Sequence, residues 1–119
     1  MGIRSILLTA FMAAWCTTVA AQDISGRYRV EGVSPTGSAY TVTADIEMSA
    51  DNTCRIKYSD GDAGICVVNG TTVTGAYIVH GKPGIIIYEI RGDGSLEGNF
   101  VEEFRGERFI GKEKLTPVR

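Results

Sequence analysis

The sequence has few of the residue types on which most catalytic and metal-binding sites depend. Among 119 residues it contains one histidine, three cysteines and one tryptophan. His80, the single histidine, has no serine–aspartate or cysteine partner in a pattern typical of a catalytic triad. A structural zinc site needs four ligands, and once Cys16 is removed with the N-terminal segment only Cys54, Cys66 and His80 remain. We therefore expect no metal and no cofactor, and an enzyme is the least favoured class of function.

An excess of positive charge is also lacking. The chain carries a formal net charge of −2 and has no run of basic residues. A weakly acidic chain argues against a nucleic acid as partner and against electrostatic docking on anionic lipid. The longest apolar run, Ile6–Val19, is shorter than the roughly 20 residues that a membrane-spanning helix needs. We expect no membrane span in the mature chain.

The N-terminus has the three parts of a secretory signal peptide. A short basic start, Met1–Arg4, precedes the uncharged run Ile6–Val19, and small residues follow at Ala20 and Ala21. This order is typical of a segment that is removed on export. We predict a signal peptide over residues 1–21, with cleavage after Ala20 as the near alternative, and a single domain over residues 22–119. The mature protein is expected to be periplasmic or secreted.

The cysteines fit an exported protein. Cys16 follows the bulky Trp15, whereas a lipidated cysteine needs a small residue before it, so cleavage is favoured over lipidation. Cys54 and Cys66 then remain, and an even count in an exported chain predicts a disulfide in preference to two free thiols. If Asp60 centres a hairpin turn, the two cysteines stand opposite each other on the core side.

The period of the hydrophobic pattern is two along most of the mature chain. Residues 24–30, 40–48 and 54–58 alternate apolar and polar side chains, which is typical of strands with one buried face. Turn signals such as Asn69-Gly70 and Asp93-Gly94 separate the runs at short intervals. The pattern predicts an all-β fold, a small antiparallel up-and-down β-barrel of about eight strands, which leaves no free strand edge.

The sixth predicted strand, Gly84–Ile90, is apolar on both faces. Either both of its faces are covered, or it leaves an exposed apolar patch. Such patches often mark a site for a partner protein or a dimer seam, so a homodimer is one expectation.

Arg91-Gly92-Asp93 is the most conspicuous short motif. Arg-Gly-Asp on an exposed loop is the signature that integrins read, and here it precedes Gly94 at a predicted hairpin tip. The motif is therefore a candidate protein-binding site. The competing and favoured interpretation is plain turn chemistry, with Arg91 ending a strand.

Glu113 is a candidate ligand-orienting residue. It alternates with Phe109, Gly111 and Leu115 and so faces an apolar side, where a carboxylate needs a hydrogen-bonding partner. The alternative is a structural buried acid held by a tyrosine or an arginine. Glu89 shares the parity of its apolar neighbours and raises the same question. The tyrosines are spread over the strands and either line a pocket or pack the core: Tyr28, Tyr40, Tyr58, Tyr77 and Tyr88.

Glycines and turn residues near both ends of the mature chain form a further pattern. Gly26–Gly32 (GRYRVEG) is followed by Gly37–Tyr40 (GSAY), and the chain closes with Gly94–Phe100 (GSLEGNF) and Gly111–Pro117 (GKEKLTP). This pattern resembles that of small exported alphaproteobacterial proteins often labelled fibronectin-binding. The resemblance implies an avidin-like or lipocalin-like barrel. It does not extend to biotin, because the tryptophan-rich box of such sites is absent.

Three functions are compatible with these features. The first is an interaction module that binds a protein, such as a host matrix protein of the fibronectin kind. The second is a carrier that holds a small ligand in the barrel interior. The third is an inhibitor of a lysozyme-type enzyme, for which the polar loop Ser34–Tyr40 would be the contact.

Overall fold

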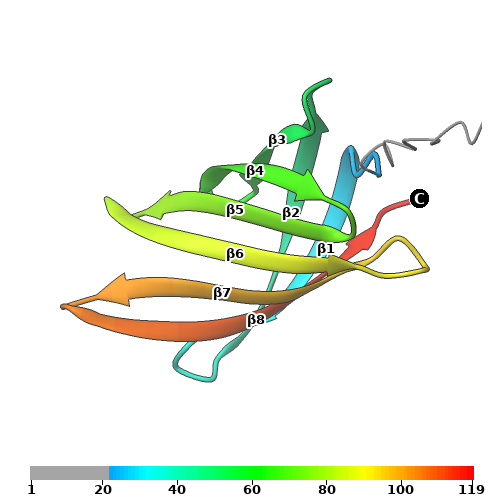
Figure 1. Ribbon diagram of the computed structural model, residues 1–119. Coiled ribbons are helices and arrows are strands. Elements are labelled where there is room, and N and C mark those ends of the chain that lie inside the picture. The colour runs from blue at the N-terminus through cyan, green and yellow to red at the C-terminus, as the bar shows by residue number, and fades with distance from the viewer. Residues whose placement is uncertain (1–21) are drawn as a thin grey trace, which may run out of the picture.

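The structure, a computed structural model, describes residues 22–119 as an all-β domain, which confirms the predicted fold class. The predicted signal peptide, residues 1–21, lies outside the described residues. Within the described range no helix is long and apolar enough to cross a membrane. Eight strands run in chain order around the barrel (Figure 1): β1 (Gly26–Val33), β2 (Ala39–Met48), β3 (Thr53–Tyr58), β4 (Ala63–Asn69), β5 (Thr72–Val79), β6 (Lys82–Ile90), β7 (Leu96–Phe104) and β8 (Glu107–Pro117).

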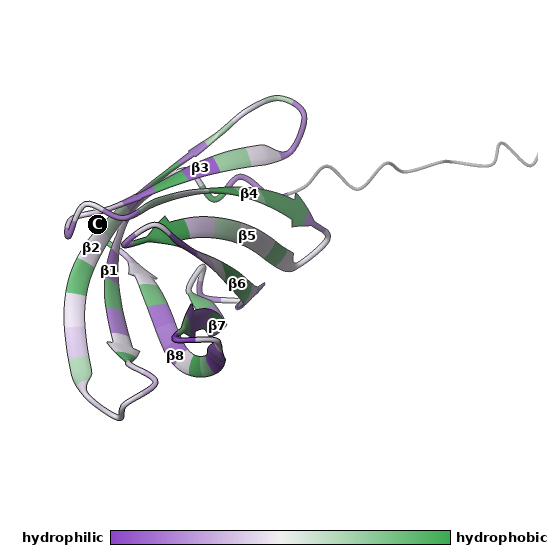
Figure 2. Ribbon diagram, turned by 90° about the vertical axis from the view of Figure 1, so that its left-hand side faces the viewer, coloured by the Kyte–Doolittle hydropathy of each residue, from purple (hydrophilic) through white to green (hydrophobic). Residues whose placement is uncertain are grey.

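Each strand pairs antiparallel with its neighbours in the chain, and β1 pairs with β8 to close the barrel. Hydropathy alternates along the strands, as the bands along β1 and β2 in Figure 2 show, and successive side chains point to opposite faces of the sheet. The inward set forms one core of buried apolar residues contributed by all eight strands. Closure leaves no unpaired sheet edge, as the sequence pattern predicts.

Two-residue turns join β5 to β6 and β7 to β8. His80 and Gly81 have φ of 49° and 76°, and Arg105 and Gly106 have φ of 52° and 78°. Positive φ at both central residues matches the twist of a tight hairpin. The strand β6 therefore begins at Lys82, two residues before the start at Gly84 that the sequence predicts, and the turn consists of His80 and Gly81 alone.

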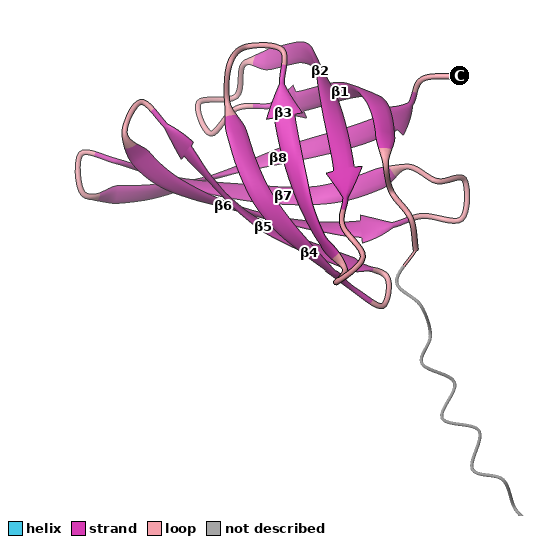
Figure 3. Cartoon of the chain, turned by 90° about the horizontal axis from the view of Figure 1, so that it is seen from above, coloured by secondary structure: helices cyan, strands magenta, loops and turns pink. Residues whose placement is uncertain are grey.

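One end of the barrel is closed by apolar side chains. Ile24 precedes β1 and is buried, its amide lies 3.3 Å from the Met48 sulfur, and its carbonyl accepts a hydrogen bond of 2.7 Å from the Tyr28 hydroxyl. Both ends of the described chain lie here, because the Val118 amide donates to the Arg27 carbonyl at the start of β1 (Figure 3). We call this the closed end. The connections β1–β2, β3–β4, β5–β6 and β7–β8 lie at the opposite, open end.

The predicted disulfide is confirmed. Cys54 on β3 stands directly opposite Cys66 on β4, with Cα atoms 4.8 Å apart and the sulfurs bonded. The neighbouring pair Ile56 and Gly64 also matches the register expected from a turn at Asp60. Both cysteines are buried among core residues, so the bridge is on the core side.

The apolar outward face of β6 belongs to a wider exposed surface. Cross-strand pairing places five uncharged residues in one row around the outside of β4 to β8. Ile65, Ile85 and Ile110 in this row are 66%, 48% and 67% exposed. Of the two alternatives for this strand, the structure therefore shows the exposed patch. We call this set the outer apolar row: Ile65, Ala76, Ile85, Val101 and Ile110.

Candidate functional site: an interior cavity at the open end

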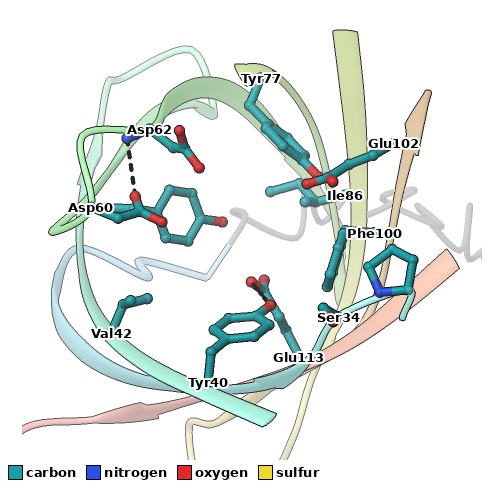
Figure 4. Close-up of a pocket in the computed structure, with 12 residues that line it drawn as sticks. Ser34, Tyr40, Val42, Asp60, Asp62, Tyr77, Ile86, Phe100, Glu102 and Glu113 are labelled. Atoms are coloured by element: carbon teal, nitrogen blue, oxygen red, sulfur yellow. Dashed lines mark hydrogen bonds between the residues drawn. The ribbon is translucent and has the colours of Figure 1, made fainter. Parts of the chain in front are cut away.

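The open end of the barrel contains a cavity of about 180 Å³. The β1–β2 loop supplies Ser34 and Pro35 to its rim, and the β3–β4 turn supplies Asp60 and Asp62. Figure 4 shows side chains from the surrounding strands that point into this common space. We call it the interior cavity; it is lined by Ser34, Pro35, Tyr40, Val42, Tyr58, Asp60, Asp62, Tyr77, Ile86, Phe100, Glu102 and Glu113.

Inward glycines hold three aromatic rings against the barrel wall. Tyr40 is paired with Gly32, Tyr77 with Gly84 and Phe100 with Gly111, each across neighbouring strands. A β-carbon at any of these glycines would collide with the ring opposite. The rings occupy the space that a side chain at each glycine would fill, so the centre of the barrel stays free at this level.

Glu113 lies at the base of the cavity in a hydrogen-bonded chain of tyrosines. The Tyr40 hydroxyl donates to Glu113 Oε1 at 2.6 Å, and the Tyr88 hydroxyl donates to Glu113 Oε2. Tyr58 lies 3.1 Å from the Tyr88 oxygen. Because the Tyr88 proton is given to Glu113, Tyr58 is the donor in that pair. Both carboxylate oxygens therefore accept, and the chain runs from Tyr58 through Tyr88 to Glu113.

The rim of the cavity carries further carboxylates. The Tyr77 hydroxyl donates to Glu102 Oε1 at 2.9 Å, and Asp60 Oδ1 accepts from the Asp62 amide at 3.0 Å. Burial raises the pKa of the Asp62 carboxyl, and the charges of Asp60 and Glu102 add to the shift. The open end of the interior is thus strongly acidic.

The protonation states follow from burial. Desolvation raises the pKa of the Glu113 carboxyl, although the hydrogen bonds from Tyr40 and Tyr88 act in the opposite direction. Desolvation, reinforced by the Glu113 charge, also raises the pKa of Tyr40 and Tyr58, so their hydroxyls stay protonated and act as donors. The site therefore combines one buried carboxyl of raised pKa with permanent hydroxyl donors.

A second and more apolar cleft, of about 420 Å³, adjoins this site. It shares Ser34, Pro35 and Glu102 with the interior cavity, and Phe104 and Phe109 contribute aromatic surface. It lies between the β1–β2 loop and the ends of the β5–β6 and β7–β8 hairpins. The two spaces together give an acidic interior with an apolar approach.

The residues singled out in the sequence lie in separate places. Glu113 points into the cavity and is held by tyrosines, whereas Glu89 lies on the outer face, where Thr71 and Thr72 donate to it. These two carboxylates are not brought together. Four of the five tyrosines lie at the cavity or directly beneath it. Tyr28 lies at the closed end, where its hydroxyl donates to the Ile24 carbonyl.

The Arg-Gly-Asp tip forms the β6–β7 connection near the closed end. Arg91 Nε lies 3.1 Å from Glu97 Oε2, and Asp93 Oδ1 accepts from both the amide and the hydroxyl of Ser95. Both charged groups are engaged within their own hairpin, which is the expected turn chemistry. A protein-binding role for this tip stays a prediction.

Three acidic members of the cavity were missed by the sequence reasoning. Glu102 follows Phe100 at the strand period of two, so parity alone could have placed it inward. The sequence gives no sign that Asp60 and Asp62 face the cavity. Both lie in a turn, where aspartate is common because its side chain forms local hydrogen bonds with the backbone.

Comparison with known proteins assigns no family to the chain. No family model matches the chain, and no curated protein matches it significantly in sequence. Among residues 22–119, no three histidine, cysteine, aspartate or glutamate side chains are grouped closely enough to hold a metal ion.

Proposed function

We propose that the mature protein is an exported binding module that takes a small molecule into the interior cavity. The observation that carries the proposal is the convergence of tyrosine hydroxyls and the Glu113 carboxyl on a space that core side chains leave free. Eight-stranded barrels have interiors that are either filled by side chains or hold one small ligand. Here the closed half is filled, and the open half offers polar groups for recognition.

The cavity has the combination of apolar walls and polar groups that is typical of small-molecule pockets. Such pockets are concave, mostly apolar and carry a few well-placed polar groups that orient the ligand. Val42, Ile86 and Phe100 supply apolar walls, while Tyr40 and Glu113 supply polar groups joined to each other. At about 180 Å³ the cavity suits a ligand of few non-hydrogen atoms.

Native mass spectrometry of the protein recovered from a bacterial periplasm tests the proposal. We expect a reproducible extra mass on the folded protein, and its loss in Val42→Phe, which fills the cavity. Thr41→Phe is the matched control, because Thr41 is exposed on the outer face of the same strand. An adduct retained by Val42→Phe, or none on the wild-type protein, would contradict the proposal.

A second candidate function, protein interaction, is supported by the outer apolar row. The row spans five neighbouring strands without a charged side chain. We propose a second copy of this chain as its occupant, since a twofold interface needs a surface that matches itself and an uncharged row meets that condition. Sedimentation should then show a dimer that Ile85→Lys dissociates and Thr41→Lys does not; a monomer at high concentration would exclude it.

A further protein-interaction proposal is that the protein binds a host matrix protein such as fibronectin. It is supported by the Arg-Gly-Asp tip and by the resemblance to proteins labelled fibronectin-binding. Saturable binding to immobilised fibronectin, weakened by Arg91→Ala and not by Arg29→Ala, would support it. Arg29 is the control because it is exposed on β1. Absence of saturable binding would exclude fibronectin as partner.

A further inference from the structure

We infer that the ligand of the interior cavity is a small organic cation, an ammonium group attached to an apolar body. This inference rests on the proposed function and specifies the chemical class of its ligand. It is carried by the charge, the hydrogen-bonding capacity and the dimensions of the cavity.

The charge of the lining is of one sign. Glu113 at the base and Glu102, Asp60 and Asp62 at the rim are acidic, and none of the twelve lining residues is lysine, arginine or histidine. All four salt bridges of residues 22–119 lie elsewhere, among exposed side chains on the outside of the barrel. A carboxylate away from water calls for a paired charge, and the cavity holds no basic side chain to supply one.

The Glu113 carboxylate has capacity for a further donor. Tyr40 and Tyr88 each occupy one of its oxygens, and an ionised carboxylate has about four acceptor positions. An ammonium group brings three N–H donors and no acceptor. It can therefore donate to Glu113 without displacing the tyrosines, which themselves turn their hydroxyl protons toward the carboxylate.

The walls favour a cation with an apolar body. The rings of Tyr40 and Phe100, with centroids 6.4 Å apart, both line the cavity and offer aromatic surface to a cation. A cavity of about 150 Å³ is enough to hold benzene, so the space of about 180 Å³ admits a group of that size. The apolar cleft beyond Pro35 can accept a longer body.

A metal ion is a poorer fit than an organic cation. Calcium requires six to eight oxygen ligands at short range. Within the described residues no three candidate ligand side chains converge in that way. The carboxylates are distributed between the base and the rim, which suits an elongated ligand better than a single ion.

The test compares three ring compounds of nearly equal size but different charge: benzylammonium, benzyl alcohol and benzoate. Calorimetric titration of the purified mature protein should show benzylammonium binding at least about tenfold more tightly than benzyl alcohol, with benzoate weakest, since hydrogen bonds to charged groups are worth a factor of that size. Glu113→Gln should lose this preference, and Glu47→Gln should keep it, because Glu47 is exposed on the outside of β2.

The outcomes separate the two proposals. Binding of benzyl alcohol or benzoate as tightly as benzylammonium would leave the cavity a binding site and overturn the cationic ligand. Binding of none of the three would overturn both.

A second measurement covers the case in which Glu113→Gln does not fold. The affinity of the wild-type protein for benzylammonium should fall as the pH is lowered through the range in which Glu113 takes up a proton, while its affinity for benzyl alcohol stays level. A flat benzylammonium profile would overturn the inference. The titratable groups that face Glu113 from the surrounding elements are Tyr40, Tyr58, Asp60, Asp62, Tyr77, Tyr88 and Glu102.

Discussion

The ring of Phe100 on β7 lies over the backbone of Gly111, the residue directly opposite it on β8. The same relationship recurs at two other pairs around the open end, and each pair keeps an aromatic ring close to the wall. Glycine has no side chain to compete for that space, so the ring can cover the neighbouring strand. The free volume of the cavity therefore depends on residues that do not themselves line it.

Gly111→Ala should destabilise the protein and reduce the cavity. The added methyl group collides with the Phe100 ring, which must swing toward the centre. We expect a loss of about 1–3 kcal/mol in the free energy of unfolding, the usual cost of overpacking a core. Gly92→Ala is the control, because nothing lies within 4 Å of a β-carbon there. Equal urea midpoints for the two variants would contradict the wall arrangement.

The same substitution at two neighbouring isoleucines on β6 should lower the stability by very different amounts. Ile86 is 3% exposed inside the barrel, and Ile85 is 48% exposed outside it. Ile86→Thr should lower the free energy of unfolding by about 2 kcal/mol, since it removes buried methyl groups and buries a hydroxyl. Ile85→Thr should change it by less than about 0.5 kcal/mol. Urea denaturation measures both, and the reverse order would mean that β6 is shifted by one residue.

Removing the Cys54–Cys66 bridge should destabilise the domain without changing its fold. The bridge closes a loop of 12 residues, and restriction of the unfolded chain by a loop of that size is worth about 3 kcal/mol. The double variant Cys54→Ala, Cys66→Ala should therefore unfold at lower urea and keep the same β-sheet circular dichroism. Addition of a reductant should lower the midpoint of the wild-type protein and leave that of the double variant unchanged. A wild-type protein insensitive to reductant would contradict this account.

The contribution of Glu113 to stability should decrease as the pH rises from about 4 toward neutrality, because burial raises the pKa of its carboxyl above the unfolded value of about 4.3. Between these two pKa values the folded state binds more protons than the unfolded state, so its advantage is lost as the pH rises. Glu113→Gln removes this group, and its unfolding free energy should fall less over the same range. Parallel profiles for the wild-type and variant proteins, without ligand, would contradict a raised pKa at Glu113.

Much of the fold could be predicted because strand parity and turn chemistry are local properties. Asp60 at a turn was enough to place Cys54 opposite Cys66, and alternation placed Glu113 inside. The end of the barrel that is closed could not be predicted. It depends on Ile24, which lies just before β1 and contacts Met48, the residue beside it when the register of β1 with β2 is continued. The alternation over residues 24–30 puts Ile24 on the buried face, but it does not indicate which end of the barrel that side chain closes.

The composition of the site was harder to predict for a similar reason. Glu102 lies on the strand that forms a hairpin with that of Glu113, but Asp60 and Asp62 are distant in the sequence and reach the same cavity only because the barrel closes. The tyrosine chain to Glu113 likewise joins β2, β3, β6 and β8. Sequence reasoning could name single inward residues, but not which of them share one level of the barrel.

The positions of the two ends of residues 22–119 determine how the protein can be immobilised. Both leave from the closed end, beside Arg27 and Ile24. A linker fused to either end, or a surface to which the protein is tethered through one, would leave the cavity facing the solution. The molecule can thus be immobilised, labelled or joined to another domain at its base without obstructing entry of a ligand.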